Sequence, residues 1–388
     1  MLGGNRVVLY NSQPCLRSKT MKNVFVLGIL AILLGVFLSA CPNNGPQIET
    51  VQLSSGLEAQ TINVQAEALT LKAGQSNHLL YLNEKTYKLG YGRNNGGDWS
   101  FKTSWDLGAS FYGASHDLFL DKNEKVHISS SISDGDDEDL GYVNNVTGFW
   151  VTSLPDAPGG SSVGMSSKIA VDHGGKVHIL HHRWNDGALL YTSNIGIFWQ
   201  TEKVLDDDWA QAVLVDSQNG LHVFCSTSHL TRVNSVWQTE EMPVSGYDFS
   251  AIIDGSDNIY ALTDWGLWFL PANGTWQDRQ DIFSQMTYEP ELTNPMVGPN
   301  ALAVDKQGVL HVAFWFWHNI GETGDDCWLY YATNQSGTWQ ATLLDHYSEA
   351  EYTYHESPVL AVSDNGEVSY AYATNNQIRF LTFNPAQL

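Results

Sequence analysis

Alternating apolar and polar positions recur in short runs along most of the chain, and this pattern predicts β-strands rather than helices. Six similar segments each contain an apolar strand, a turn of the Asp-x-x-Gly type and a second strand, which in most copies opens with an apolar–His or apolar–Tyr pair. They read HDLFLDKNEKVHIS from His116, SKIAVDHGGKVHIL from Ser167, QAVLVDSQNGLHVF from Gln211, SAIIDGSDNIYAL from Ser250, NALAVDKQGVLHVAF from Asn300 and PVLAVSDNGEVSYAY from Pro358. A weaker copy, KAGQSNHLLYL, begins at Lys72.

A second predicted hairpin follows most copies and consists of a strand with aromatic residues, a Gly/Asn turn and a tryptophan. These tryptophans are Trp99, Trp150, Trp199, Trp237, Trp276 and Trp339. Two hairpins make four antiparallel strands in each unit, and the turn positions recur at spacings of 38 to 58 residues. Strand-rich repeats of about this length are typical of propeller blades. The sequence therefore predicts an all-β, seven-bladed β-propeller over residues 65–388, with six blades as the alternative.

The seventh unit lacks a tryptophan strand of its own and ends at LTFNPAQL. At the other end of the repeats, residues 47–71 contain spare strand-like sequence. We expect part of it to supply the missing outer strand, because closing the ring removes exposed strand edges. Residues 42–64 are accordingly interpreted as a tether with a possible ring-closing strand.

Two local patterns resemble known propeller repeats. Thr333, Asn334, Gly337 and Trp339 loosely match the Asp-box hairpin of sialidase-like BNR propellers. The Asp-x-x-Gly-x-x-His strand resembles the BNR-like repeats of some secreted polysaccharide-processing proteins, including propeller ulvan lyases. The resemblance covers about residues 65–388. It implies a propeller, whereas the activity has to be argued from the site.

The N-terminal region has the layout of a secretory signal. From Met21 it reads MKNVFVLGILAILLGVFLSAC, with a lysine, an apolar run and small residues before Cys41. Leu38-Ser39-Ala40-Cys41 resembles a lipobox, which implies a bacterial lipoprotein with residues 1–41 as leader and Cys41 as the lipidated residue. A transmembrane helix is the alternative, and the apolar run of 17 residues is short for spanning. We expect a lipid-anchored protein of the cell envelope, in the outer membrane where the host has one.

The net charge bears on the class of ligand, and the cysteines bear on disulfide bonding. The formal net charge of the 388-residue chain is −23, which repels nucleic acid and gives no support to polyanion binding. Cys225 and Cys327 are the two cysteines beyond the leader region. Because they fall in non-adjacent units, they are expected to be free and buried.

A histidine recurs at one position of several units. His127, His178, His222 and His311 occupy the same place, with Tyr260 in a fifth copy. Residues repeated once per blade sit in different blades, so they do not converge on a metal. A structural role, such as hydrogen bonding to a turn, is expected for them.

Strand order assigns the remaining chemistry to one face. In a four-stranded blade the Asp turn and the tryptophan turn share a face, while the loops between strands two and three and the connections between blades share the opposite one. That opposite face collects the non-repeated sequence, and variable loops on a rigid ring are where binding function is usual. The candidate ligand-binding residues are His181, His182, Arg183, Trp184, Trp315, Trp317, His318, Tyr352, Tyr354 and His355.

Aromatic rings beside carboxylates suit a glycan, so non-catalytic recognition of a glycan or of an envelope protein is the leading hypothesis. A lyase for uronate polysaccharides is the enzymatic alternative, with His181 or His182, Arg183 and Tyr191 in acid, base and charge-neutralising roles. A sialidase fits less well, because the chain beyond residue 40 has five arginines and no family arginine motif. No cofactor is predicted; Asp134, Asp136 and Glu138 are candidate calcium ligands, with a solvated acidic loop as the alternative.

Overall fold

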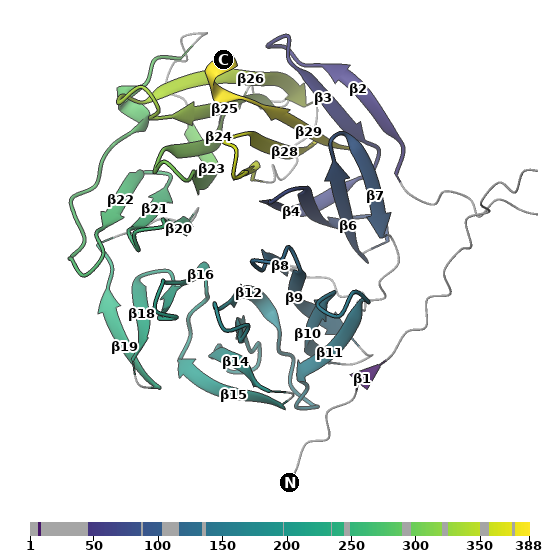
Figure 1. Ribbon diagram of the computed structural model, residues 1–388, viewed down its shortest axis with the longest axis vertical. Coiled ribbons are helices and arrows are strands. Elements are labelled where there is room, and N and C mark those ends of the chain that lie inside the picture. The colour runs from purple at the N-terminus through teal and green to yellow at the C-terminus, as the bar shows by residue number, and fades with distance from the viewer. Residues whose placement is uncertain are drawn as a thin grey trace, which may run out of the picture.

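The computed structural model describes residues 7–8, 46–86, 88–102, 116–133, 137–196, 198–233, 235–243, 249–288, 296–319, 325–349, 357–374 and 377–388. Seven antiparallel sheets follow one another around a central axis, as the predicted seven-bladed propeller requires (Figure 1). The helices of this part of the chain are too short and too polar to span a bilayer.

Six blades are built from consecutive strands, and their bounds are as follows. Blade 1 contains β4 (Ala66–Ala73), β5 (Asn77–Asn83), β6 (Lys88–Asn95) and β7 (Asp98–Lys102). Blade 2 contains β8 (His116–Leu120), β9 (Val126–Ser133), β10 (Glu138–Asn144) and β11 (Val151–Asp156). Blade 3 contains β12 (Met165–Val171), β13 (Val177–His182), β14 (Leu189–Ile195) and β15 (Phe198–Leu205). Blade 4 contains β16 (Ala212–Val215), β17 (Leu221–Phe224), β18 (Ser228–Val233) and β19 (Val236–Glu241). Blade 5 contains β20 (Ser250–Ile253), β21 (Ile259–Thr263) and β22 (Gly266–Leu270), and blade 6 contains β23 (Met296–Val304), β24 (Leu310–Asn319), β25 (Asp325–Thr333) and β26 (Gln340–Glu349).

Blade 5 departs from the four-strand pattern at its outer edge. The backbone of Gln277 donates to Phe269, and Gln280 and Leu267 exchange two hydrogen bonds. Residues 277–280 thus occupy the position of a fourth strand. Gln277 and Gln280 are three residues apart, whereas their partners on β22, Phe269 and Leu267, are two residues apart. The mismatch interrupts the ladder, so the fourth strand is reduced to an isolated bridge. Two short 3₁₀ helices, Phe283–Gln285 and Pro385–Gln387, lie outside the sheets.

The seventh blade joins the two ends of the repeat region. It combines β27 (Val359–Val362), β28 (Val368–Thr374) and β29 (Gln377–Phe383) with β3 (Glu58–Ile62) and an outermost β2 (Ile48–Gln52). Ile62 lies opposite Ile378, so the spare strand-like sequence does supply the missing outer strand. A short segment, β1 (Val7–Val8), pairs with the outer edge of β11.

A buried polar cluster fastens the closing hairpin to its neighbours. Asp345 on β26 accepts hydrogen bonds from the Tyr372 hydroxyl at 2.5 Å and from the backbone N–H of Ser54 at 3.1 Å, and it also pairs with Arg379. Asp345 is buried, so these contacts take the place of water around its carboxylate. The cluster joins blade 6, blade 7 and the turn between β2 and β3.

Aromatic contacts connect each blade to the next. The rings of Tyr91, Tyr142 and Tyr191 meet Trp150, Trp199 and Trp237 edge-on at 5.2, 5.2 and 5.3 Å. At the closure, Phe380 of blade 7 meets Trp99 of blade 1 at 5.0 Å in the same way. The tryptophans are therefore inter-blade packing residues, as expected. Because inner strands pack on both faces, every residue of β13 is buried.

Hydrogen bonds between the two turns of a blade confirm that they share a face. The side chains of Asn145, Asn194 and Asn334, in the tryptophan turns, accept from the backbone N–H that opens strand two, at 2.7, 2.7 and 2.9 Å. We call the face of the Asp turns and tryptophan turns the repeat face. The opposite face, with the strand two–three loops and the connections between blades, is the irregular face. Cys225 and Cys327 are both buried and form no disulfide, as predicted.

Candidate ligand-binding surface

The repeated histidines form the same buried contact in four blades. Nδ1 of each lies 2.5 to 2.7 Å from a tyrosine hydroxyl on strand three of the same blade. The pairs are His78–Tyr91, His127–Tyr142, His178–Tyr191 and His311–Tyr331. In blade 4 the partner is a second histidine, with His222 Nδ1 at 3.0 Å from His229 Nε2. These contacts give the repeated histidines the structural role that was expected.

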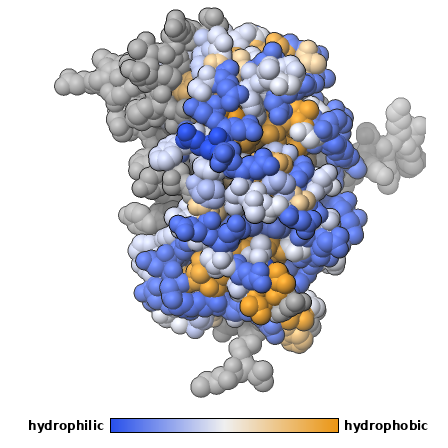
Figure 2. All heavy atoms as spheres, turned by 90° about the vertical axis from the view of Figure 1, so that its left-hand side faces the viewer, coloured by the Kyte–Doolittle hydropathy of each residue, from blue (hydrophilic) through white to orange (hydrophobic). Residues whose placement is uncertain are grey.

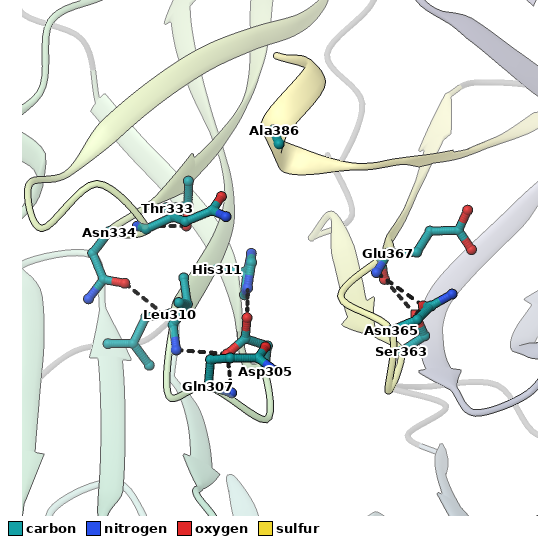
Figure 3. Close-up of polar contacts among 12 residues, drawn as sticks. Asp305, Gln307, Leu310, His311, Thr333, Asn334, Ser363, Asn365, Glu367 and Ala386 are labelled. Carbon is teal, nitrogen blue, oxygen red and sulfur yellow. Dashed lines mark hydrogen bonds and ion pairs between the residues drawn. The ribbon is translucent and has the colours of Figure 1, made fainter.

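The turn aspartates complete this network on the repeat face. Asp305 accepts from the backbone N–H groups of Gln307 and Val309, each at 2.8 Å, and its other oxygen lies 3.6 Å from His311 Nε2 (Figure 3). Asp121, Asp172 and Asp216 hold their histidines at 3.4 to 3.8 Å. Burial lowers the pKa of His178 to about 4, so its ring is neutral at pH 7. The Asp–His–Tyr chains tie turns to strands, and they belong to the scaffold.

The irregular face of blades 2 to 4 is one hydrogen-bonded cluster of loops. Asp137 accepts from the backbone of Gly160 at 2.6 Å, and Asn185 accepts from the backbone of Ser162 at 3.2 Å. Asp208 in turn accepts from the backbone of Ser226 at 3.3 Å. Each contact joins a strand two–three loop to a connection between blades. Loops held in this way present their side chains in a fixed arrangement.

His181 lies beneath this surface and makes its contacts inside the blade. Its Nε2 lies 2.8 Å from the Thr192 hydroxyl, and its Nδ1 accepts from the backbone N–H of Gly164 at 3.2 Å. Burial is the largest cause that lowers its pKa, to about 3. The prediction that His181 contacts a ligand is therefore wrong. The second strand of a blade packs against neighbouring blades on both faces. Every residue of β13 is therefore buried, and alternation along the strand does not expose His181.

His182 forms the floor of the cluster. Its ring stacks on Trp209 with centroids 3.7 Å apart, and it lies close to the backbone of Gly187 in the following loop. Burial lowers the pKa of His182, and the Gly187 backbone, Asp207 and Asp186 raise it by less. A neutral imidazole stacked on an indole presents a flat, apolar support beneath the loop that follows β13.

Arg183 and Trp184 form the outer part of the same loop. The guanidinium donates two hydrogen bonds to Asp186, from Nε at 2.8 Å and from Nη2 at 2.7 Å. This contact lowers the pKa of Asp186 to about 2. The backbone N–H of Trp184 donates to Ser162 at 3.0 Å, yet 63% of the Trp184 surface is exposed. A large aromatic side chain thus stands in solvent on a fixed loop, beside Ser161 and Asn185.

The predicted residues of blade 6 lie in strands. Residues 315–319 were expected in a loop, but β24 continues to Asn319 and pairs with β25. Trp315 is buried in the core between blades 6 and 7, where a Cβ at Gly298 would approach its ring to 2.5 Å. Its assignment as a ligand platform is therefore wrong. Trp317 and His318 lie on β24 opposite Cys327 and Asp326.

Several predicted residues lie outside the described part of the chain. They are Cys41, Asp134, Asp136, Tyr352, Tyr354 and His355. Glu138 begins β10, and its backbone N–H donates to Ser162 at 3.4 Å. Within the described ranges no three His, Cys, Asp or Glu side chains are grouped to hold a metal ion.

The described residues do not assemble the catalytic sets considered from the sequence. Tyr191 contacts His178 in the core, and Arg183 is neutralised by Asp186. Arg93, Arg232 and Arg379 lie in three other blades, beside Ser76, Glu202 and Asp345. The uronate lyase would need His181 or His182 to meet Arg183 and Tyr191 at the surface, and the sialidase would need three arginines together. Neither arrangement is present among these residues.

A central channel runs between the inner strands of all seven blades. Its cavity has a volume of about 730 Å³ and is lined by the inner strands β4, β8, β12, β16, β20, β23 and β27. Most lining side chains are apolar, with Lys72, Asp117, Lys168 and Asn300 among the polar ones. Asp117 is engaged, because it accepts from the backbone N–H of Ile169 at 3.0 Å. The channel thus carries both engaged polar groups and unpaired ones, with the buried side-chain amide of Asn300 among the unpaired.

Comparisons with known proteins bear on the fold. No family model matches the chain, and no curated protein sequence matches it. Solved structures that resemble it include YCF48 bound to D1 peptide, with 14% identity, a TM-score of 0.51 and coverage of 87% of this chain and 96% of that one. Virginiamycin B lyase from Staphylococcus aureus has 11% identity, a TM-score of 0.49 and coverage of 87% and 99%. YCF48 from Cyanidioschyzon merolae has 11% identity, a TM-score of 0.48 and coverage of 88% and 99%. At such identities the likeness to YCF48 bound to D1 peptide shows the propeller fold alone.

The structure also shows exposed residues that the sequence analysis did not single out. Trp265, between β21 and β22, is exposed on the irregular face of blade 5. On the repeat face, apolar residues are exposed at the tryptophan turns of blades 2, 3 and 4. A signal was present in the sequence, since the residue before the tryptophan is Phe149, Phe198 or Val236 in these blades only. This difference between blades was not used in the prediction, because all tryptophan turns were assigned the same structural role.

Proposed function

We propose that the protein is a recognition module of the cell envelope, and that it binds a glycan on the irregular face at the loop cluster around Trp184. The observation that carries this proposal is the exposed indole of Trp184 on a loop that is fixed on both sides. Its backbone donates to Ser162, and the following residues are held by the Arg183–Asp186 ion pair. The Trp184 ring is exposed although the loop that carries it is held in place, and an exposed aromatic ring on a fixed loop can serve as a contact surface.

The chemistry around the ring suits a sugar. Trp184 offers a flat apolar face to the C–H groups of a pyranose ring. Ser161, Asn185 and Asp207 lie in the same loop cluster and can exchange hydrogen bonds with hydroxyl groups. Arg183 keeps its charge paired with Asp186, so a neutral glycan is favoured over a uronate. The formal charge of −23 also disfavours an anionic polysaccharide.

The experiment is a glycan array probed with the chain from residue 42 onward. We expect binding to at least one neutral oligosaccharide, which the Trp184→Ala variant loses and the Trp184→Phe variant retains in part. Phe149→Ala, which removes an exposed aromatic ring from the opposite face, is the matched control and should bind like the wild type. If no sugar binds and a stable protein partner co-purifies instead, the glycan assignment is wrong and the envelope-protein alternative takes its place.

A further inference from the structure

Three neighbouring blades carry exposed apolar side chains at the same position of the repeat. These are Val146 and Phe149 in blade 2, Ile195 and Phe198 in blade 3, and Val233 and Val236 in blade 4. Their exposed fractions range from 45% to 78%, and they are six of the ten exposed large hydrophobic residues in the described chain. Each pair flanks a tryptophan turn on the repeat face. We call these three turns the apolar tips.

The other blades provide an internal comparison. The residue before the tryptophan is Asp98 in blade 1, Thr275 in blade 5 and Thr338 in blade 6, and all three are exposed. Folding therefore accepts a polar residue at this position, because the buried part of the turn is the tryptophan. The apolar residues of blades 2 to 4 need another explanation, and exposed apolar patches commonly mark interaction sites.

The tips are also free of charge. Residues 140–155, 187–201 and 233–239 contain no Asp, Glu, Lys or Arg, although such residues make up 16% of the chain. Figure 2, which faces the side of the ring with blades 4 and 5, shows a largely hydrophilic surface interrupted by groups of apolar residues, one of them toward its lower end. Separate, uncharged, projecting tips suit a continuous apolar medium better than a single protein groove.

We propose that the apolar tips insert into the interface of a lipid bilayer, so that the repeat face rests on the membrane and the irregular face points away from it. Phenylalanine and aliphatic side chains enter the boundary between headgroups and acyl chains when no charge accompanies them. Lipids with no net charge are the expected surface, because the acidic chain is repelled by anionic headgroups.

The tether is long enough to allow this orientation if Cys41 is lipidated. β2 begins at the irregular face, because Ile48 lies opposite Ile62 at the end of β3 that leads into blade 1. Its five residues cross the blade over about 17 Å. The seven residue steps from Cys41 to Ile48 reach at most about 25 Å. A lipid anchor at Cys41 and the apolar tips can thus meet the same bilayer.

The experiment uses the chain from residue 42 onward, which lacks any lipid but contains every strand of the seven sheets except the two-residue β1. Binding to phosphatidylcholine vesicles is measured by co-sedimentation. The variant F149T/F198T/V236T introduces the residue that blades 5 and 6 carry at this position, and binding should fall about tenfold or more. The Trp184→Ala and Trp265→Ala variants, which alter exposed tryptophans of the irregular face, should bind vesicles like the wild type.

A second readout reports insertion directly. Because Cys225 and Cys327 are buried, the thiol of a Phe149→Cys variant can be labelled selectively with an environment-sensitive fluorophore. Vesicles should shift its emission to the blue, whereas the same label on the Trp265→Cys variant, on the irregular face, should not respond. Equal vesicle binding by the wild type and the triple variant would overturn the proposal. A second result would also overturn it: the wild type does not bind vesicles but forms a dimer, and the triple variant is a monomer. The apolar tips would then join two copies of the chain. Glycan binding, measured separately, does not depend on either outcome.

Discussion

Acidification should destabilise this propeller through its buried histidines, and His178 allows the effect to be tested at one position. Its Nδ1 lies 2.7 Å from the Tyr191 hydroxyl, and burial lowers its pKa from 6.5 to about 4. Lys176 and Arg232 also oppose protonation, while Asp172 favours it less strongly than burial opposes it. The unfolded state therefore binds a proton near pH 6.5 and the folded state does not. Stability is present above that pH and is lost as the pH falls toward 4.

The magnitude follows from the two pKa values. Between pH 7.5 and pH 5, one histidine with a pKa of 6.5 unfolded and about 4 folded removes about 2 kcal/mol of unfolding free energy. Burial lowers the pKa of His78, His116 and His229 to about 4 as well. The wild type should therefore lose several kcal/mol over this range, which is a large part of a typical domain's stability.

The assay is urea unfolding at a series of pH values between 7.5 and 5, followed by tryptophan fluorescence. At pH 7.5 the His178→Gln variant should be less stable by about 1–3 kcal/mol, because the buried Tyr191 hydroxyl loses one of its hydrogen-bond partners. At pH 5 the deficit should shrink by about 2 kcal/mol, since the variant has one proton fewer to take up on unfolding. His173→Gln, which alters an exposed histidine of the neighbouring turn, is the control and should follow the wild type. Parallel pH curves for His178→Gln and the wild type would refute the reasoning.

Further predictions concern the ring closure and the core of blade 6. Replacing Asp345 by alanine should cost about 3–5 kcal/mol, because the half-buried Arg379 is left without its partner, and Asp345→Asn should be nearly as harmful. Both are checked by thermal unfolding, and a change in melting temperature no larger than that of surface substitutions would contradict the closing role of the cluster. Gly298→Ala should destabilise by about 1–3 kcal/mol, because its Cβ would lie 2.5 Å from a ring atom of Trp315. Gly255→Ala, where an added Cβ meets nothing within 4 Å, is its control, and equal stability of the two variants would show that the Trp315 packing is looser than described.

The fold could be predicted because its signals are local and repeated. Each Asp turn, histidine and tryptophan is a weak indicator alone, but their recurrence at a similar spacing defines the blade. The closing strand was predictable for the same reason, since one unit lacked a strand that residues 47–71 could supply. The irregular fourth strand of blade 5 was not predictable, because it depends on one extra residue opposite β22.

The candidate site was predicted less completely, because burial is decided by the neighbouring blades. His181 and His182 are adjacent in the sequence, yet one is enclosed within blade 3 and the other stacks on Trp209 beneath the surface loops. Trp315 was expected in a loop because strand length varies between blades, and β24 is longer than its counterparts. Trp184 remained at the surface because it follows the end of β13, beyond the reach of the adjacent blades.

The central claim is that Trp184 is the contact surface of a recognition site on the irregular face. Isothermal titration of the best sugar from the array against the wild type, Trp184→Ala and Trp265→Ala tests it most directly. The account predicts that Trp184→Ala raises Kd about ten- to hundredfold, as expected for losing an aromatic contact, while Trp265→Ala, on the irregular face of blade 5, leaves Kd within about threefold. An unchanged Kd for Trp184→Ala would contradict it.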